Sequence, residues 1–224
     1  MWRLPPVQNE CITITLFPTF IALGWLGPTK KNPITLKAYK KIDVTISRPK
    51  SIRPYLQDFI HYNKLEHSFV ALSLSTPAIY ETFTSLATTI SQARDIYAEN
   101  NKANNSLQHY FLHSNHNGTH TFYVYTVPLG LIAQYQILLH TLELQPSIIT
   151  SSYLALIECY KKIFGAAYRQ SQMAVDMLSH HYKLENAIQQ SLINRLVFIP
   201  SEYKNEVEKL SLLTMLGLYY QKEK

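Results

Sequence analysis

The sequence predicts an α/β fold in which helices pack against a mixed sheet. Short runs alternate apolar and polar residues, as half-buried strands do, and longer segments repeat apolar residues at helical spacing. The two kinds of segment follow one another along the chain, which favours helices packed on a sheet. With 224 residues, 46% of them hydrophobic, the chain is long enough for one large domain or two small ones sharing a core.

The first part of the chain is predicted to run strand, strand, strand, helix, strand. Isoleucine and leucine alternate with threonine over residues 11–16, and Phe17-Pro18-Thr19 predicts the bend of a β-hairpin. A further strand is expected over 34–46, a helix over 55–64 and another strand over 69–75. This order is typical of a mixed sheet covered by helices.

The longest uncharged run raises the question of a membrane segment. Its stretch from Cys11 to Leu26 is shorter than the roughly 20 residues of a spanning helix and contains Pro18. A secretory signal is the alternative, because Arg3 precedes the run, although Ala22-Leu23-Gly24 is a poor cleavage site. The alternating pattern favours the hairpin.

The second part mixes helices and strands. Pro128 is expected to open a helix with Leu131, Tyr135, Leu138 and Leu142 on one face. Asn117-Gly118 suits a hairpin turn between two strands. The remaining predicted elements are helices over 88–101, 153–164 and 202–220 and strands over 107–111, 121–127, 147–150, 173–178 and 195–199.

Three stretches of the second part resemble a known family. Residues 121–135 and 142–157 resemble the strand, helix, short strand and small-residue helix of PilM, an actin-like protein of type IV pilus assembly. Residues 173–179 followed by 195–200 are similar to a phosphate-binding hairpin of actin-like ATPases, and 212–220 look like the closing helix of such chains. The chain is shorter than a full PilM and more closely resembles the reduced HofM-like branch. The resemblance implies a truncated actin-like, ribonuclease H-like fold.

The nucleotide-binding residues depart from the family pattern. Actin-like ATPases hold phosphates on two Asp-x-Gly turns, where glycine lets the backbone approach the oxygens. Here Thr15 stands at the first aspartate position, and Phe17-Pro18 replaces the glycine turn. In the second turn Asp176 is kept, but Leu178 replaces the glycine. We therefore expect no working ATP site, no enzymatic activity, no catalytic residue and no cofactor.

The resemblance also implies a domain organisation and a partner. We expect a degenerate actin-like subdomain over 1–86 and 146–224, with a small inserted subdomain over 87–145. The family docks the cytoplasmic tail of PilN, a bitopic inner-membrane protein, in a groove beside the insertion, so the implied function is a cytoplasmic scaffold associated with the inner membrane through its partner. Self-association stays open. The candidates for the groove wall are Tyr80, Phe83, Tyr123 and Tyr125, although aromatic residues in such positions are more often core or sheet-face residues.

Other function classes are weighed against this one. The net charge of +6 permits a DNA-uptake module or an anionic-membrane partner, but lysines and arginines form no dense stripe, so nucleic acid is not expected. A degenerate protein that still binds nucleotide is the other rival. The spacing of His113, His116 and His120 could suit zinc, but a polar hairpin loop is favoured and no metal is expected. The two cysteines give no disulfide framework.

Overall fold

A computed structural model of the chain describes residues 10–30, 34–45, 48–75, 80–86, 106–116, 119–164 and 206–222. The chain forms two compact units, one of residues 1–75 with 137–224 and one of residues 76–136. The division thus falls after residues 75 and 136, whereas the sequence-based boundaries were drawn after 86 and 145. None of the described helices is both long and apolar enough to span a bilayer.

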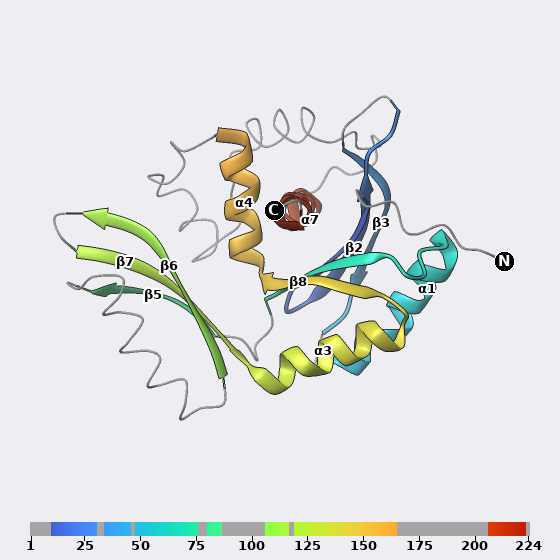
Figure 1. The fold of residues 1–224 in the computed structure, drawn as a ribbon, viewed down its shortest axis with the longest axis horizontal. Coiled ribbons are helices and arrows are strands. Elements are labelled where there is room, and N and C mark those ends of the chain that lie inside the picture. The colour runs from blue at the N-terminus through green and yellow to red at the C-terminus, as the bar shows by residue number, and fades with distance from the viewer. Residues whose placement is uncertain are drawn as a thin grey trace. The chain divides into compact units, whose positions relative to one another are not determined.

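The first unit contains a five-stranded mixed sheet in the order β3-β2-β1-β4-β8 (Figure 1). Strand β2 pairs antiparallel with both β1 and β3, whereas β4 pairs in parallel with both β1 and β8. The strand bounds are Cys11–Leu16 for β1, Phe20–Gly27 for β2, Thr35–Asp43 for β3, Phe69–Leu74 for β4 and Gln145–Ser151 for β8. These assignments confirm the strands and the hairpin predicted for this part of the chain.

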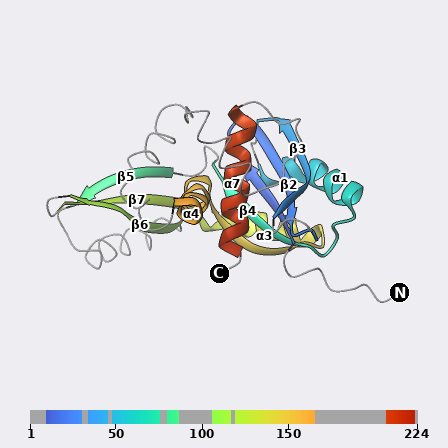
Figure 2. The same ribbon diagram turned by 90° about the horizontal axis from the view of Figure 1, so that it is seen from above.

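Helices cover both faces of this sheet. Helix α1 (Arg53–Asn63), which follows the short 3-10 helix η1 (Pro49–Ile52), lies on the side of the sheet opposite α7 (Glu206–Lys222) in both views (Figures 1 and 2). Coverage on both sides explains why every residue of β1 is buried, isoleucines and threonines alike. The alternation in β1 therefore separates an apolar face from a hydroxyl-bearing face. Both faces are buried, so it does not separate a buried face from a solvent-exposed one.

Helix α7 is buried on all sides rather than along one stripe. It packs against the sheet and against α4 (Ser152–Phe164), and all ten residues from 211 to 220 are buried. The helix predicted over 202–220 is confirmed from Glu206 onward. Burial of consecutive residues follows from its contacts with both the sheet and α4.

The second unit holds a three-stranded antiparallel sheet in the order β5-β7-β6. Its strands are β5 (Tyr80–Leu86), β6 (Ser106–His116) and β7 (Thr119–Pro128), and helix α3 (Leu129–Thr141) follows directly. The pairing of β6 with β7 confirms the predicted strands. Strand β5 was not predicted, because its large apolar residues recur every third position, at 80, 83 and 86, rather than every second.

Several predicted elements lie outside the described residues. They are the helix over 88–101, the turn at Asn117-Gly118 and the strands over 173–178 and 195–199. The three histidines considered as zinc ligands lie on β6 and β7, not in a loop as expected. The strands extend further toward the turn than the polar sequence indicated, because main-chain pairing continues to His116 and Thr119.

Candidate functional site

The carboxyl ends of β1, β4 and β8 meet at one edge of the first unit's sheet. In open α/β sheets this edge is where ligands bind. The register places Thr15 of β1 beside Ser73 of β4, and Ser73 beside Thr150 of β8. Three hydroxyl-bearing residues therefore form a row across the edge at which an actin-like protein would hold phosphate.

The side chains of this hydroxyl row are almost completely shielded from solvent. Thr15 and Ser73 are fully buried, and Thr150 is 9% exposed. Ser152 donates a hydrogen bond to Ser73 Oγ at 3.2 Å, and the N–H of Leu154 donates to Ser151 Oγ at 3.2 Å. The second bond caps the N-terminus of α4, which explains why the helix begins at Ser152. The serine hydroxyls at this edge therefore take part in hydrogen bonds that stabilise the fold.

The turn between β1 and β2 closes the same edge. The side chain of Phe17 is buried and stacks on Phe20 with ring centroids 4.3 Å apart. The N–H of Phe17 donates to the carbonyl of Phe20 at 3.0 Å, and the N–H of Ser75 donates to the carbonyl of Leu16 at 2.9 Å. An aromatic pair and satisfied main-chain groups therefore stand at this turn.

The chemistry available at this edge is limited. The row contains hydroxyls and no carboxylate, and no group of three or more histidine, cysteine, aspartate or glutamate residues suited to a metal occurs in the described ranges. Within those ranges Thr15 Oγ1 has no hydrogen-bond partner, although it is buried. Asp176 and Leu178 lie outside the described residues. A row of neutral hydroxyls supplies neither the carboxylate ligands that Mg²⁺ prefers nor a general base that works near neutral pH.

The two cysteines add no nucleophile. Cys11 and Cys159 are both buried and free. Burial raises the pKa of the Cys11 thiol to about 12 and raises the pKa of the Cys159 thiol further. Because the thiolate is the reactive form, both groups are inert at neutral pH.

The aromatic candidates for a peptide groove belong to the second unit. Phe83 of β5 lies opposite Tyr123 of β7, and Glu81 lies opposite Tyr125. Since side chains alternate along a strand, positions 83, 123 and 125 share one face of the sheet, whereas Tyr80, opposite Thr126, belongs to the other face. Tyr125 is 2% exposed. The register thus brings three of the four candidates together.

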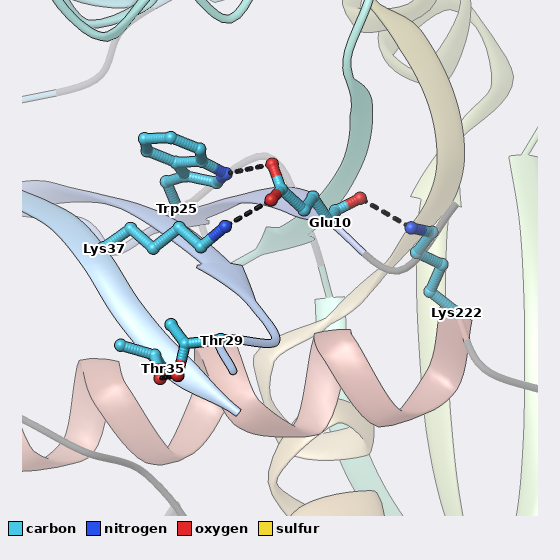
Figure 3. Close-up of polar contacts among 6 residues, drawn as sticks. All are labelled: Glu10, Trp25, Thr29, Thr35, Lys37 and Lys222. Carbon is cyan, nitrogen blue, oxygen red and sulfur yellow. Dashed lines mark hydrogen bonds and ion pairs between the residues drawn. The ribbon is translucent and has the colours of Figure 1, made fainter. Parts of the chain in front are cut away.

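Polar contacts also gather around Glu10 (Figure 3). Its carboxylate accepts a hydrogen bond from Trp25 Nε1 at 3.1 Å and pairs with the ammonium group of Lys37. Its carbonyl accepts from Lys222 Nζ at 2.6 Å. Lys37 also lies over the Trp25 ring, 4.8 Å from its centroid. Glu10 therefore acts as a structural clasp: its carboxylate binds Trp25 and Lys37, and its carbonyl joins the start of β1 to the end of α7 through Lys222.

Sequence reasoning found Thr15 and Phe17 but missed the serines. Ser73 and Ser151-Ser152 each follow an apolar strand pattern, and parallel strands bring their carboxyl ends to one edge. That pattern was the signal that could have identified them. The Glu10 clasp had no such signal, because it joins residues 212 positions apart.

Comparisons with known proteins identify the fold. No family model and no curated protein matches the chain. The structure of a PilM-PilN type IV pilus biogenesis complex matches with a TM-score of 0.53 and 10% identity, over 70% of this chain and 51% of that one. The cytoplasmic domain of EpsL, an inner-membrane component of the type II secretion system of Vibrio cholerae, gives a TM-score of 0.44 and 12% identity over 66% and 59%. Thermus thermophilus RuvC gives 0.44 and 8% over 96% of each chain.

The strand order and the match to the PilM-PilN structure define an α/β protein with an actin-like, ribonuclease H-like fold. The predicted fold class is confirmed. The chain spans about half the length of the PilM-PilN chain that it matches.

Proposed function

We propose that this chain is a non-catalytic cytoplasmic scaffold of a type IV pilus or related secretion or competence complex at the inner membrane. It belongs, on this proposal, to the reduced HofM-like branch of PilM-like proteins and binds the cytoplasmic tail of a PilN-like bitopic protein. The observation that carries the proposal is a dry row of hydroxyls, Thr15, Ser73 and Thr150, at the edge where an ATPase of this fold binds phosphate. On this proposal the chain acts by binding a partner and not by phosphate chemistry.

The second unit supplies a strand edge for such a tail. Strand β5 is an edge of its sheet in the described part of the chain, with β7 on its inner side. An extended peptide can add to such an edge through main-chain hydrogen bonds, and the side-chain positions beside it supply specificity. The face that carries positions 83 and 123 is the proposed specificity face, and the buried Tyr125 lies beside them on the same side of the sheet.

Calorimetry with a synthetic peptide tests the proposal. The peptide is the cytoplasmic tail of the PilN-like protein encoded beside this chain, titrated without nucleotide. We expect a Kd in the micromolar range, about −8 kcal/mol. Phe83→Ala should weaken binding, whereas Thr84→Ala, on the other face of β5, should not. Absence of binding to a protein that circular dichroism shows to be folded would remove the scaffold function.

Tyr125 needs a gentler substitution than a charged one. Because it is 2% exposed, aspartate there would bury a charge and damage the fold whether or not the tail binds nearby. Tyr125→Phe keeps the ring and removes only the hydroxyl, so it tests the position with the fold preserved.

The rival reading, a protein that still binds nucleotide, is separated by thermal unfolding. A ligand present at 100 times its Kd stabilises the folded state by about 2.7 kcal/mol. With Phe17 and Phe20 stacked at the turn, we expect millimolar ATP with Mg²⁺ to leave the melting temperature unchanged. A clear rise in that temperature would favour the nucleotide-binding alternative.

A further inference from the structure

The excess positive charge of the chain comes from one segment. Residues 28–66 contain nine lysines and arginines and three acidic residues, a net of +6, which equals the net charge of the whole chain. The remaining residues carry twelve basic and twelve acidic side chains and are balanced. The segment forms β3, η1 and α1 of the first unit.

Five exposed cations of this segment form what we term the basic surface: Lys40, Arg48, Lys50, Arg53 and Lys64. Arg48, Lys50 and Arg53 fall within six residues along η1 and the start of α1, so their backbones lie within about 10 Å. Lys40 is on the face of β3 opposite Tyr39, whose hydroxyl meets Ser211 of α7 at 2.9 Å. It therefore lies on the α1 side of the sheet, and Figures 1 and 2 place β3 and α1 at the same end of the unit.

The fold makes no polar use of these five side chains. Lys37 and Lys41, from the same segment, pair with Glu10 and Asp43. By contrast, in the described part of the chain no side chain of the basic surface takes part in an ion pair or a hydrogen bond. The first turns of η1 and α1 also contain no acidic residue. Cations at the start of a helix oppose its dipole and cost stability. The positive charges at the starts of η1 and α1 thus lower the stability of the folded state.

We propose that the basic surface docks on an anionic phospholipid membrane. Groups of four to eight lysines and arginines suit the negative potential of such a membrane. A nucleic-acid duplex fits less well, because it rewards six to ten phosphate contacts and this surface offers five cations. The inference goes beyond the proposed tail binding, since it needs neither the partner nor the second unit.

Vesicle co-sedimentation tests this directly with the full-length protein. We expect binding to vesicles of 30% phosphatidylglycerol in phosphatidylcholine, none to pure phosphatidylcholine, and release at 0.5 M NaCl, where charges are screened. Each basic side chain at a membrane surface contributes about fivefold, about 1 kcal/mol. The triple variant Lys40→Glu, Lys50→Glu, Arg53→Glu should therefore bind at least on the order of 100-fold more weakly. Because two of these changes put acidic residues at helix starts, the triple variant should not be less stable.

A matched pair controls for overall charge. Lys50→Glu and Lys162→Glu change the net charge equally at exposed positions, but Lys162 lies on α4. Only Lys50→Glu should weaken vesicle binding. Equal losses in the pair, or equal binding to neutral vesicles, would overturn the proposal. Tighter binding to a 30-base-pair duplex than to anionic vesicles at the same salt, lost in the triple variant, would overturn it in favour of nucleic acid.

Discussion

Gly217 of α7 lies directly against the main chain of Ala155 of α4. A Cβ built on Gly217 would stand 3.1 Å from the Cα of Ala155 and closer still to its carbonyl group. The absence of a side chain thus lets the two helices approach backbone to backbone. The same helix meets the sheet at a second glycine, because a Cβ on Gly24 would come within 2.6 Å of Met215 Sδ. These two glycines therefore determine how closely α7 packs against α4 and against the sheet.

The first prediction concerns Gly217. Replacement by alanine forces α7 away from α4, and overpacking of this kind costs about 1–3 kcal/mol of unfolding free energy. Gly130 of α3 is the matched control, since a Cβ there meets nothing within 4 Å, so Gly130→Ala should stabilise the protein by up to about 1 kcal/mol. Urea denaturation compares the two variants. Equal stabilities would show that the helices do not need their close approach.

The second prediction concerns the buried hydroxyl of Thr15. Its oxygen has no hydrogen-bond partner among the described residues, and an unsatisfied buried polar group costs about 1–3 kcal/mol. Thr15→Val, which keeps the shape and removes the hydroxyl, should leave stability unchanged or raise it. Thr15→Asp restores the family's carboxylate but buries a charge, so it should lower the urea midpoint without creating ATP binding. Magnesium-dependent ATP binding by Thr15→Asp would show that the site is nearly intact.

The third prediction concerns the closing helix. A chain ending at residue 205 loses α7 and exposes the sheet face and α4, at about 1.5–3 kcal/mol for each large side chain unburied. We expect it to be insoluble, or to lose its cooperative thermal transition. A chain ending at Lys222 keeps the hydrogen bond to Glu10 and should match the full-length protein. If the chain ending at residue 205 stayed soluble and were as stable as the chain that keeps α7, the packing of α7 on the sheet would be contradicted.

The fourth prediction concerns alkaline pH. Burial raises the pKa of Tyr135 from 10.0 to about 12 and that of Cys11 from 9.0 to about 12. Between the unfolded and folded values the native state binds more protons than the unfolded state, so unfolding free energy falls as pH rises. Below pH 9 the contribution is constant. The fall should approach about 1.4 kcal/mol per pH unit for each group.

Tyr135→Phe isolates one of these groups. Without the hydroxyl, the loss of stability above pH 10 should be shallower, while the loss that begins near pH 9 through Cys11 should persist. Urea titrations from pH 8 to 11 make the comparison. An unchanged slope in Tyr135→Phe would show that this tyrosine is reached by solvent in the folded state.

Local patterns of apolar and polar residues in the sequence determined most of the helices and strands of this protein. The alternation in residues 11–16, the bend at Pro18 and the spacing of apolar residues in α4 placed strands and helices correctly, because such periodicities record which side of an element is apolar. The resemblance to actin-like ATPases pointed to Thr15 and Phe17 at the turn between β1 and β2. Strand β5 escaped it because its apolar residues repeat every third position.

Only the tertiary structure decided which residues share the edge of the sheet and which cations remain free. Thr15, Ser73 and Thr150 are far apart in sequence and become neighbours through parallel pairing. Lysines 37 and 50 look alike in the sequence, yet one is paired with Glu10 and the other has no ion pair in the described part of the chain. The periodicity of apolar residues shows which face of a helix or strand is apolar. It does not show which residues pack against that face, because these come from distant parts of the sequence.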